Sequence, residues 1–148
     1  MLVVFDIDGT LANIDHRIDF VRMKPKDWKA FDAGIPRDSI NDPVARVFDA
    51  MVSAGHGVIL VSGRSDRTRQ VTQDWLSAKS LTGYLRLYMR SDGDYRADDI
   101  VKRDILDQVI ADFGKKPDMV FDDRPRVVNM WRDQGIFVFD VYQGKDDF

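Results

Sequence analysis

A short apolar run leads straight into two carboxylates near the amino terminus: Leu2-Val3-Val4-Phe5-Asp6-Ile7-Asp8-Gly9-Thr10. Four consecutive apolar residues are typical of a strand buried on both faces, as in a parallel sheet. Asp6 and Asp8 follow that strand at once. In doubly wound sheets the reactive groups gather beyond the carboxyl ends of the strands. The residues that follow each strand are therefore where chemistry is expected.

Apolar runs alternate with helix-like stretches along the rest of the chain. Asp42 is expected to cap the first long helix, because Pro43 suits the first helical position. The alternation predicts an α/β fold, with a doubly wound, mainly parallel sheet flanked by helices. Further strands are predicted at Gly57–Val61, Tyr84–Tyr88, Met119–Phe121 and Ile136–Val141, and helices from Asp42 to Gly55, about Asp66 to Ala78, Asp98 to Gly114 and Pro125 to Gly135.

Residues 13–41 do not fit this alternation. We expect one domain over residues 1–148, with 13–41 as a small, partly helical insertion after the first strand. It can cover the strand ends as a cap or flap, or it can be an ordinary packed surface insertion. Trp28 lies in this segment and is a candidate for stacking on a nucleic-acid base.

Composition excludes several classes of protein. The chain has 148 residues, 22 Lys+Arg against 25 Asp+Glu, a net charge of −3 and no cysteine. A strongly basic nucleic-acid coat protein is excluded, as are disulfides, thiolate zinc sites and a thiol nucleophile. No apolar run approaches the roughly 18–20 residues of a membrane span, and the amino-terminal run is too short for a signal peptide. We therefore expect no membrane partner and a cytoplasmic location.

Polar residues follow three of the predicted strands. Asp6 and Asp8 follow the first, Ser62-Gly63-Arg64 the second and Asp122-Asp123 the fourth, while Lys102 lies in the third helix. Two carboxylates about 4 Å apart repel by roughly 4 kcal/mol at an effective dielectric of about 20. A hard cation relieves this repulsion, and oxygen ligands favour Mg²⁺. The pattern indicates a magnesium site at one edge of the sheet.

These residue types suit the hydrolysis of a phosphate ester. A metal screens the charge of the phosphate, so that an Asp carboxylate can attack phosphorus and form an aspartyl-phosphate. A second carboxylate can protonate the leaving oxygen and then activate water. The Ser62 hydroxyl and a backbone N–H can hold phosphoryl oxygens, and Lys102 can neutralise charge in the transition state.

The residues Asp6-Ile7-Asp8-Gly9-Thr10 resemble motif I of the haloacid dehalogenase (HAD) superfamily. Val61-Ser62-Gly63-Arg64 looks like motif II, Lys102 fits motif III and Phe121-Asp122-Asp123-Arg124 looks like motif IV. All occur in family order. Longer stretches resemble the 3′-phosphatase domain of bacteriophage polynucleotide kinase; they are residues 93–102, residues 122–132 and a chain end with Gly144 and Asp147-Phe148.

The resemblance implies a role for each residue. Asp6 would be the nucleophile and Asp8 the general acid and base, with Lys102 as the third catalytic residue. Mg²⁺ would be held by Asp6, the backbone carbonyl of Asp8, Asp122 and Asp123. The substrate phosphate would meet Thr10, Ser62, Gly63 and Arg64, beside Lys102. Arg90 and Arg96 are candidates for nucleotide contacts, or belong to an ordinary charged loop.

The expected function is a Mg²⁺-dependent phosphatase that removes 3′-phosphates from DNA or RNA ends. One alternative is a nucleotidase or small-molecule phosphomonoesterase of the same superfamily, and another is an inactive HAD-like module that binds a partner protein. No G-x-x-x-x-G-K-[ST] motif occurs, so we expect no kinase activity. The phage resemblance suggests a phage-encoded enzyme that acts in the host cytoplasm.

Overall fold

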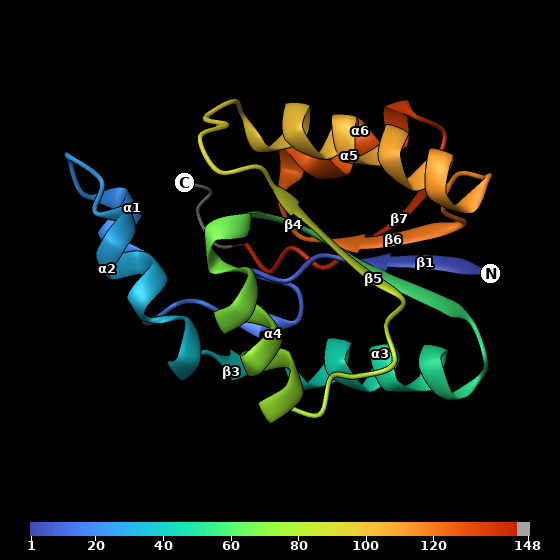
Figure 1. Ribbon diagram of the computed structural model, residues 1–148, viewed down its shortest axis with the longest axis horizontal. Coiled ribbons are helices and arrows are strands. Elements are labelled where there is room, and N and C mark those ends of the chain that lie inside the picture. The colour runs from blue at the N-terminus through green and yellow to red at the C-terminus, as the bar shows by residue number, and fades with distance from the viewer. Residues whose placement is uncertain (145–148) are drawn as a thin grey trace.

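A five-stranded parallel sheet forms the centre of the computed structural model, which describes residues 1–144 (Figure 1). β1 lies in the middle and pairs with β4 on one side and β6 on the other. The predicted doubly wound α/β fold is confirmed, and every strand pair in this sheet is parallel. In sheet order the strands are β5 (Arg86–Arg90), β4 (Gly57–Ser65), β1 (Leu2–Phe5), β6 (Met119–Asp122) and β7 (Phe137–Asp140).

Helices cover both faces of the sheet. Successive side chains of a strand point to opposite faces; Val3 and Phe5 accordingly join the core under α3 (Asp42–Ser53) and α4 (Arg69–Ala78). Leu2 and Val4 join the core under α5 (Asp98–Phe113) and α6 (Pro125–Asp133). In Figure 1, α5 and α6 lie above the sheet and α3 and α4 below it. This double coverage explains why the strands read as continuous apolar runs.

Some predicted boundaries were wrong. Asn41, and not Asp42, holds the N-cap position of α3, and its side-chain amide instead donates to the carbonyl of Thr10. Residues Asp66–Thr68 form a separate 3₁₀ turn, η2, before α4 begins. β4 continues beyond Val61 through the polar residues to Ser65, with a register shift against β5 between Ser62 and Ser65. The fifth strand in chain order, β5, begins two residues later than expected.

Residues 13–41 form a compact excursion beside the carboxyl ends of the strands, at the left of Figure 1. A two-stranded antiparallel pair, β2 (Ala12–Asn13) with β3 (Ser39–Ile40), closes its base. Between them lie α1 (Asp19–Arg22), α2 (Trp28–Ala33) and the 3₁₀ helix η1 (Ile35–Arg37). Across the described residues, no helix has the length and apolar character needed to cross a membrane.

Candidate active site

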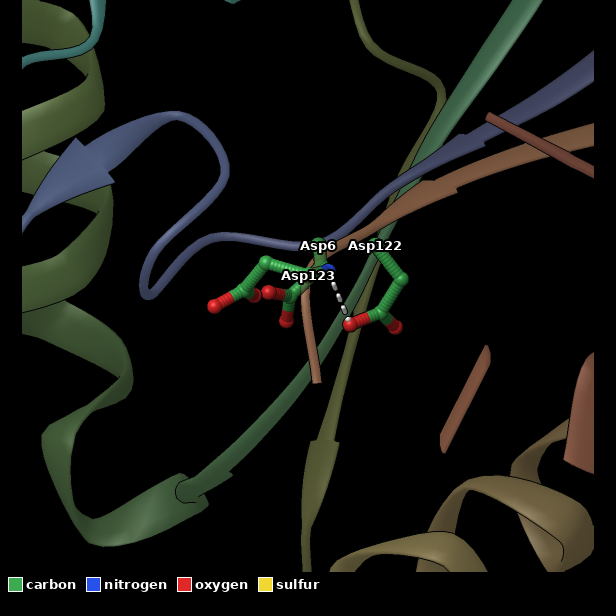
Figure 2. Close-up of side chains that lie close together, drawn as sticks. All are labelled: Asp6, Asp122 and Asp123. Atoms are coloured by element: carbon green, nitrogen blue, oxygen red, sulfur yellow. Dashed lines mark hydrogen bonds between the residues drawn. The ribbon is translucent and has the colours of Figure 1, made fainter. Parts of the chain in front are cut away.

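Three carboxylates meet where β1 and β6 end. Asp6, Asp122 and Asp123 each offer an oxygen, and these oxygens all lie within 4.8 Å of one another. Figure 2 shows the three side chains gathered at the ends of the two strands. Parallel neighbours end at the same edge of a sheet, and the pairing of Phe5 with Phe121 brings the residues that follow them together.

Hydrogen bonds fix the positions of these carboxylates. The Asp6 amide donates to the Phe121 carbonyl (3.0 Å), and the Asp123 amide donates to Asp122 Oδ1 (2.9 Å; dashed in Figure 2). Thr10 Oγ1 lies 3.1 Å from Asp6 Oδ2 and 3.2 Å from Asp123 Oδ1, so its proton can serve either carboxylate. Thr10 is fully buried. Thr10 therefore helps to hold the carboxylates of Asp6 and Asp123 in place.

Lys102 reaches the same point from α5. Its Nζ donates to Asp6 Oδ1 at 2.8 Å and to Asp122 Oδ2 at 3.0 Å, and its side chain is 1% exposed. Burial opposes the ammonium charge, but Asp122 and Asp6 outweigh it and raise the pKa of Lys102 well above its usual value. The indole N–H of Trp131 also donates to Asp122 Oδ2. Lys102 is thus a permanent cation between two acidic groups.

One ammonium does not balance three carboxylates. Burial and the charge of Asp122 raise the pKa of Asp6 well above its usual value, although Lys102 opposes this. The same two causes raise the pKa of Asp123 to about 6. Oxygen-only donors with surplus negative charge suit a hard divalent cation. The donor set therefore fits the predicted Mg²⁺, with Asp6, Asp122 and Asp123 as the side chains that would hold it.

Asp123→Asn should stabilise the metal-free protein above pH 6 and weaken its response to Mg²⁺. A carboxyl with a higher pKa folded than unfolded favours folding below about pH 4, and this advantage is lost as pH rises through about 6. Thermal unfolding from pH 4 to 8, with and without Mg²⁺, measures both effects. In the wild type, stability should fall from pH 4 to 8 without Mg²⁺ and recover when Mg²⁺ is added. If Mg²⁺ stabilised Asp123→Asn as much as the wild type, Asp123 would not be a ligand of the metal.

Asp8 lies apart from the carboxylate group and faces arginines. Arg64 Nε donates to both of its oxygens at 3.1 Å, and Arg17 Nη2 donates to Oδ1 at 3.0 Å. Burial alone would raise the pKa of Asp8, but Arg64 and Arg17 together lower it. Asp8 is thus held as a carboxylate. That the backbone carbonyl of Asp8 is a ligand of Mg²⁺ stays a prediction.

Asp38 ties the insertion to this pair of arginines. It accepts from Arg17 Nε and Nη2 at 2.8 Å each and from Arg64 Nη2 at 3.3 Å, and His16 Nε2 lies 2.6 Å from Oδ1. The sequence gives no local signal for this network, because residues 17 and 38 lie in a segment without hydrophobic periodicity. Arg64 also bonds to Thr72 Oγ1. Its predicted contact with phosphate stays a prediction, since the described contacts make it a positioning residue for Asp8.

Asp38→Asn should lower the unfolding free energy by about 3 kcal/mol, because it leaves two buried guanidinium groups to share one carboxylate. Phosphatase turnover should fall as well, since Asp8 loses its fixed orientation. The matched control is Asp32→Asn, whose carboxylate pairs with the exposed Arg67 at 2.6 Å. That surface pair should contribute less than about 1 kcal/mol. Urea unfolding compares the two variants, and equal losses would contradict a structural role for the Asp38 network.

Ser62 and Gly63 lie at the end of β4, beside the cluster. Ser62 is buried and its hydroxyl accepts from the Arg64 amide (3.1 Å). A Cβ on Gly63 would collide with the carboxylate of Asp98, so a larger residue here would require the Asp98 side chain to move. Asp98 pairs with Arg90 at 3.2 Å, and Arg90 also donates to the Gly63 carbonyl. Arg90 therefore braces the loop, and its contact with a nucleotide stays a prediction.

A cleft of about 830 Å³ opens above these groups and reaches the insertion. Asp6, Asp8 and Asp123 lie on its wall, as do Gly63 and Arg64. Arg96 lines it too, but its side chain is half exposed and pairs with Asp94 and Asp104. Thr10, Ser62 and Lys102 are buried beneath this wall.

Comparison with known protein families tests the resemblance that the motifs suggested. Residues 1–148 match the model of the polynucleotide kinase PNKP phosphatase domain. The chain belongs to this family of phosphatase domains. The resemblance drawn from the motifs is thereby confirmed, although the predicted likeness at Asp147-Phe148 lies outside the described residues. The role of each site residue stays a prediction.

Relatives of this phosphatase domain are longer proteins. The chain is 30% identical over 142 residues to the "Putative bifunctional polynucleotide kinase/RNA ligase" of Autographa californica nuclear polyhedrosis virus, covering 94% of this chain and 19% of that protein. It is 30% identical, with a TM-score of 0.79, to a chain in the Pnkp1/Rnl/Hen1 RNA repair complex, covering 98% and 43%. A hydrolase from Streptococcus pneumoniae TIGR4 shares the fold at 14% identity and a TM-score of 0.65, covering 93% and 90%. The chain thus spans less than half of the first two relatives.

Proposed function

We propose that this phosphatase domain is a Mg²⁺-dependent polynucleotide 3′-phosphatase that acts through a phosphorylated Asp6. One observation carries the proposal. Asp6, at the end of the central strand, lies with Asp122 and Asp123 within 4.8 Å and receives a hydrogen bond from Lys102, in a chain that matches a phosphatase family throughout. Mg²⁺ held by these carboxylates would screen the charge of the phosphate and so admit an anionic nucleophile.

The first step forms a bond between an Asp6 carboxylate oxygen and phosphorus while the bond from phosphorus to the sugar 3′-oxygen breaks. Lys102 neutralises negative charge that develops beside Asp6. The leaving oxygen takes a proton from Asp8 and becomes a hydroxyl. In the second step the oxygen of water bonds to phosphorus and its proton passes to Asp8. The bond from phosphorus to the Asp6 oxygen breaks, which restores the Asp6 carboxylate and releases phosphate.

The contacts of Asp8 favour the second of its two tasks. Arg64 and Arg17 lower the pKa of Asp8 and keep it ionised, which suits a base that accepts a proton from water. Before the first step Asp8 must take up a proton from solvent, and its lowered pKa means that this proton is held less tightly than on an ordinary carboxyl. Its transfer to the leaving oxygen is correspondingly easier.

A nucleic-acid end is the favoured substrate because the family is that of polynucleotide kinase phosphatase domains and one relative is part of an RNA repair complex. The net charge of −3 does not oppose this, since an enzyme that works on an end needs few backbone contacts. We propose that residues 13–41 act as a cap over the site. We also propose a phage or other viral origin, which the viral relative supports, and action in the cytoplasm of the host.

Phosphate release from a 3′-phosphorylated oligonucleotide, measured beside a panel of nucleoside 3′- and 5′-monophosphates, tests the substrate class. The proposal predicts a much higher kcat/KM for the oligonucleotide. Equal or higher rates on the monophosphates would favour a nucleotidase instead. No turnover of any ester with Mg²⁺ present, together with a protein that co-purifies, would favour the binding module.

A further inference from the structure

An exposed indole forms part of the cleft wall. Trp28, the first residue of α2, is 47% exposed and lines the same cleft as Asp6. Its ring packs edge to face against Phe31, with centroids 5.8 Å apart and an interplanar angle of 88°. Lys26 Nζ lies 5.5 Å from the ring centroid. The contact with Phe31 holds the ring in a defined tilt, while nearly half of the side chain stays open to a ligand.

The insertion side of the cleft differs in chemistry from the carboxylate side. Apolar side chains gather there around Trp28, namely Ile14, Ile18 and Phe31. The charges on this side are mixed, with Arg22 and Lys26 beside Asp15 and Asp32. A phosphate alone needs only the carboxylate end. A nucleoside 3′-phosphate also carries a planar base on the same sugar, and that base must lie close to the reacting phosphate. Both kinds of surface line one cleft of about 830 Å³.

We propose that Trp28 is the stacking platform for the base of the 3′-terminal nucleotide. Stacking on an indole tolerates any base, because every base has an aromatic face. The ammonium of Lys26 lies over the ring, so the base would stack on the ring face that Lys26 does not cover, and the ammonium suits a strand that carries phosphates. This inference rests on the proposed function, and it assigns the insertion a task in binding the substrate.

Phe31 connects this platform to the groups below it. The guanidinium carbon of Arg17 lies 4.2 Å from the Phe31 ring centroid, and Arg17 in turn donates to Asp8. The platform and the proposed acid and base are thus supported by the same packed side chains. The ring of Trp28 is thus linked to Asp8 through Phe31 and Arg17.

Steady-state kinetics on 3′-phosphorylated oligonucleotides test the platform. Trp28→Ala should raise KM about 10-fold and leave kcat within about 2-fold, while Trp28→Phe keeps most of the affinity. An oligonucleotide with an abasic 3′-terminal nucleotide should show the same rise in KM with the wild type and no further rise with Trp28→Ala. Phe137→Ala is the matched control, because Phe137 is an exposed aromatic residue on β7 that is absent from the cleft wall. It should leave KM unchanged.

Fluorescence gives a second readout that does not depend on turnover. The other two tryptophans, Trp75 and Trp131, are buried, so Trp28 is the indole open to a ligand. A 3′-phosphorylated oligonucleotide added to Asp6→Asn protein should quench emission, and the quench should vanish in the Asp6→Asn, Trp28→Phe double variant. Turnover with equal KM for normal and abasic ends would overturn the platform while the phosphatase stands. Absence of turnover would overturn the proposed function. If the oligonucleotide also failed to quench the emission of Asp6→Asn protein, the platform would be overturned as well.

Discussion

Asp6→Asn is expected to lower phosphate release by about 10⁴-fold or more, the loss typical of removing a covalent nucleophile. An amide oxygen carries no charge with which to attack phosphorus. That loss corresponds to about 5 kcal/mol of transition-state stabilisation. Initial rates of phosphate release under saturating Mg²⁺ measure it directly.

The same variant should remain folded. Asp6 is one of three crowded carboxylates, and its raised pKa shows that its charge is unfavourable in the folded chain. Loss of that charge should leave the melting temperature of the metal-free protein equal or higher. Asp74→Asn on α4 serves as the control, because the carboxylate of Asp74 accepts an exposed hydrogen bond from Gln70, away from the cleft. Turnover near that of the wild type in Asp6→Asn would remove Asp6 as the nucleophile.

Lys102→Met should remove both activity and much of the stability. The ammonium is buried between Asp6 and Asp122, so its loss leaves two carboxylates without a compensating charge. Breaking a buried ion pair by removing one partner costs about 3–5 kcal/mol. Turnover should fall about 10³-fold, because Lys102 also stabilises charge in the transition state. Methionine fills a similar volume, so that loss of packing adds little.

Lys115→Met is the matched control, because it removes a lysine that pairs with a carboxylate at the surface and not in the interior. Lys115 Nζ lies 2.7 Å from Asp118, as close as Lys102 lies to Asp6, but its side chain is 50% exposed. An exposed pair contributes less than about 1 kcal/mol. Urea unfolding of both variants gives the comparison, and Mg²⁺ should restore part of the stability of Lys102→Met because a cation replaces the lost charge. Equal destabilisation of the two variants would contradict the structural role of Lys102.

The sequence could predict that Asp6 and Asp122 lie close together, because this requires only that the strands before them run parallel in one sheet. Both residues follow four-residue or shorter apolar runs, and in a parallel sheet such runs end at one edge. Lys102 was found through its place in a family motif. A single lysine on an amphipathic helix carries no local signal of burial.

The arginine network under Asp8 could not be predicted in the same way. Arg17 and Asp38 meet through the fold of the insertion, where short helices of four and six residues give no periodic pattern. The end of β4 was also misjudged. Polar residues after Val61 suggested a loop, yet Ser62 and Ser65 continue the pairing with β5. Backbone pairing with a neighbouring strand decides where a strand ends, and sequence polarity does not report it.

One oligonucleotide that carries distinguishable labels in its 3′-phosphate and its 5′-phosphate tests whether this protein is a Mg²⁺-dependent 3′-phosphatase that acts through Asp6. We expect Mg²⁺ to trigger release of the 3′ label, the 5′ label to stay on the strand, and Asp6→Asn to release neither. Release of the 5′ label at a comparable rate, or release of the 3′ label without Mg²⁺ or without Asp6, would contradict this expectation.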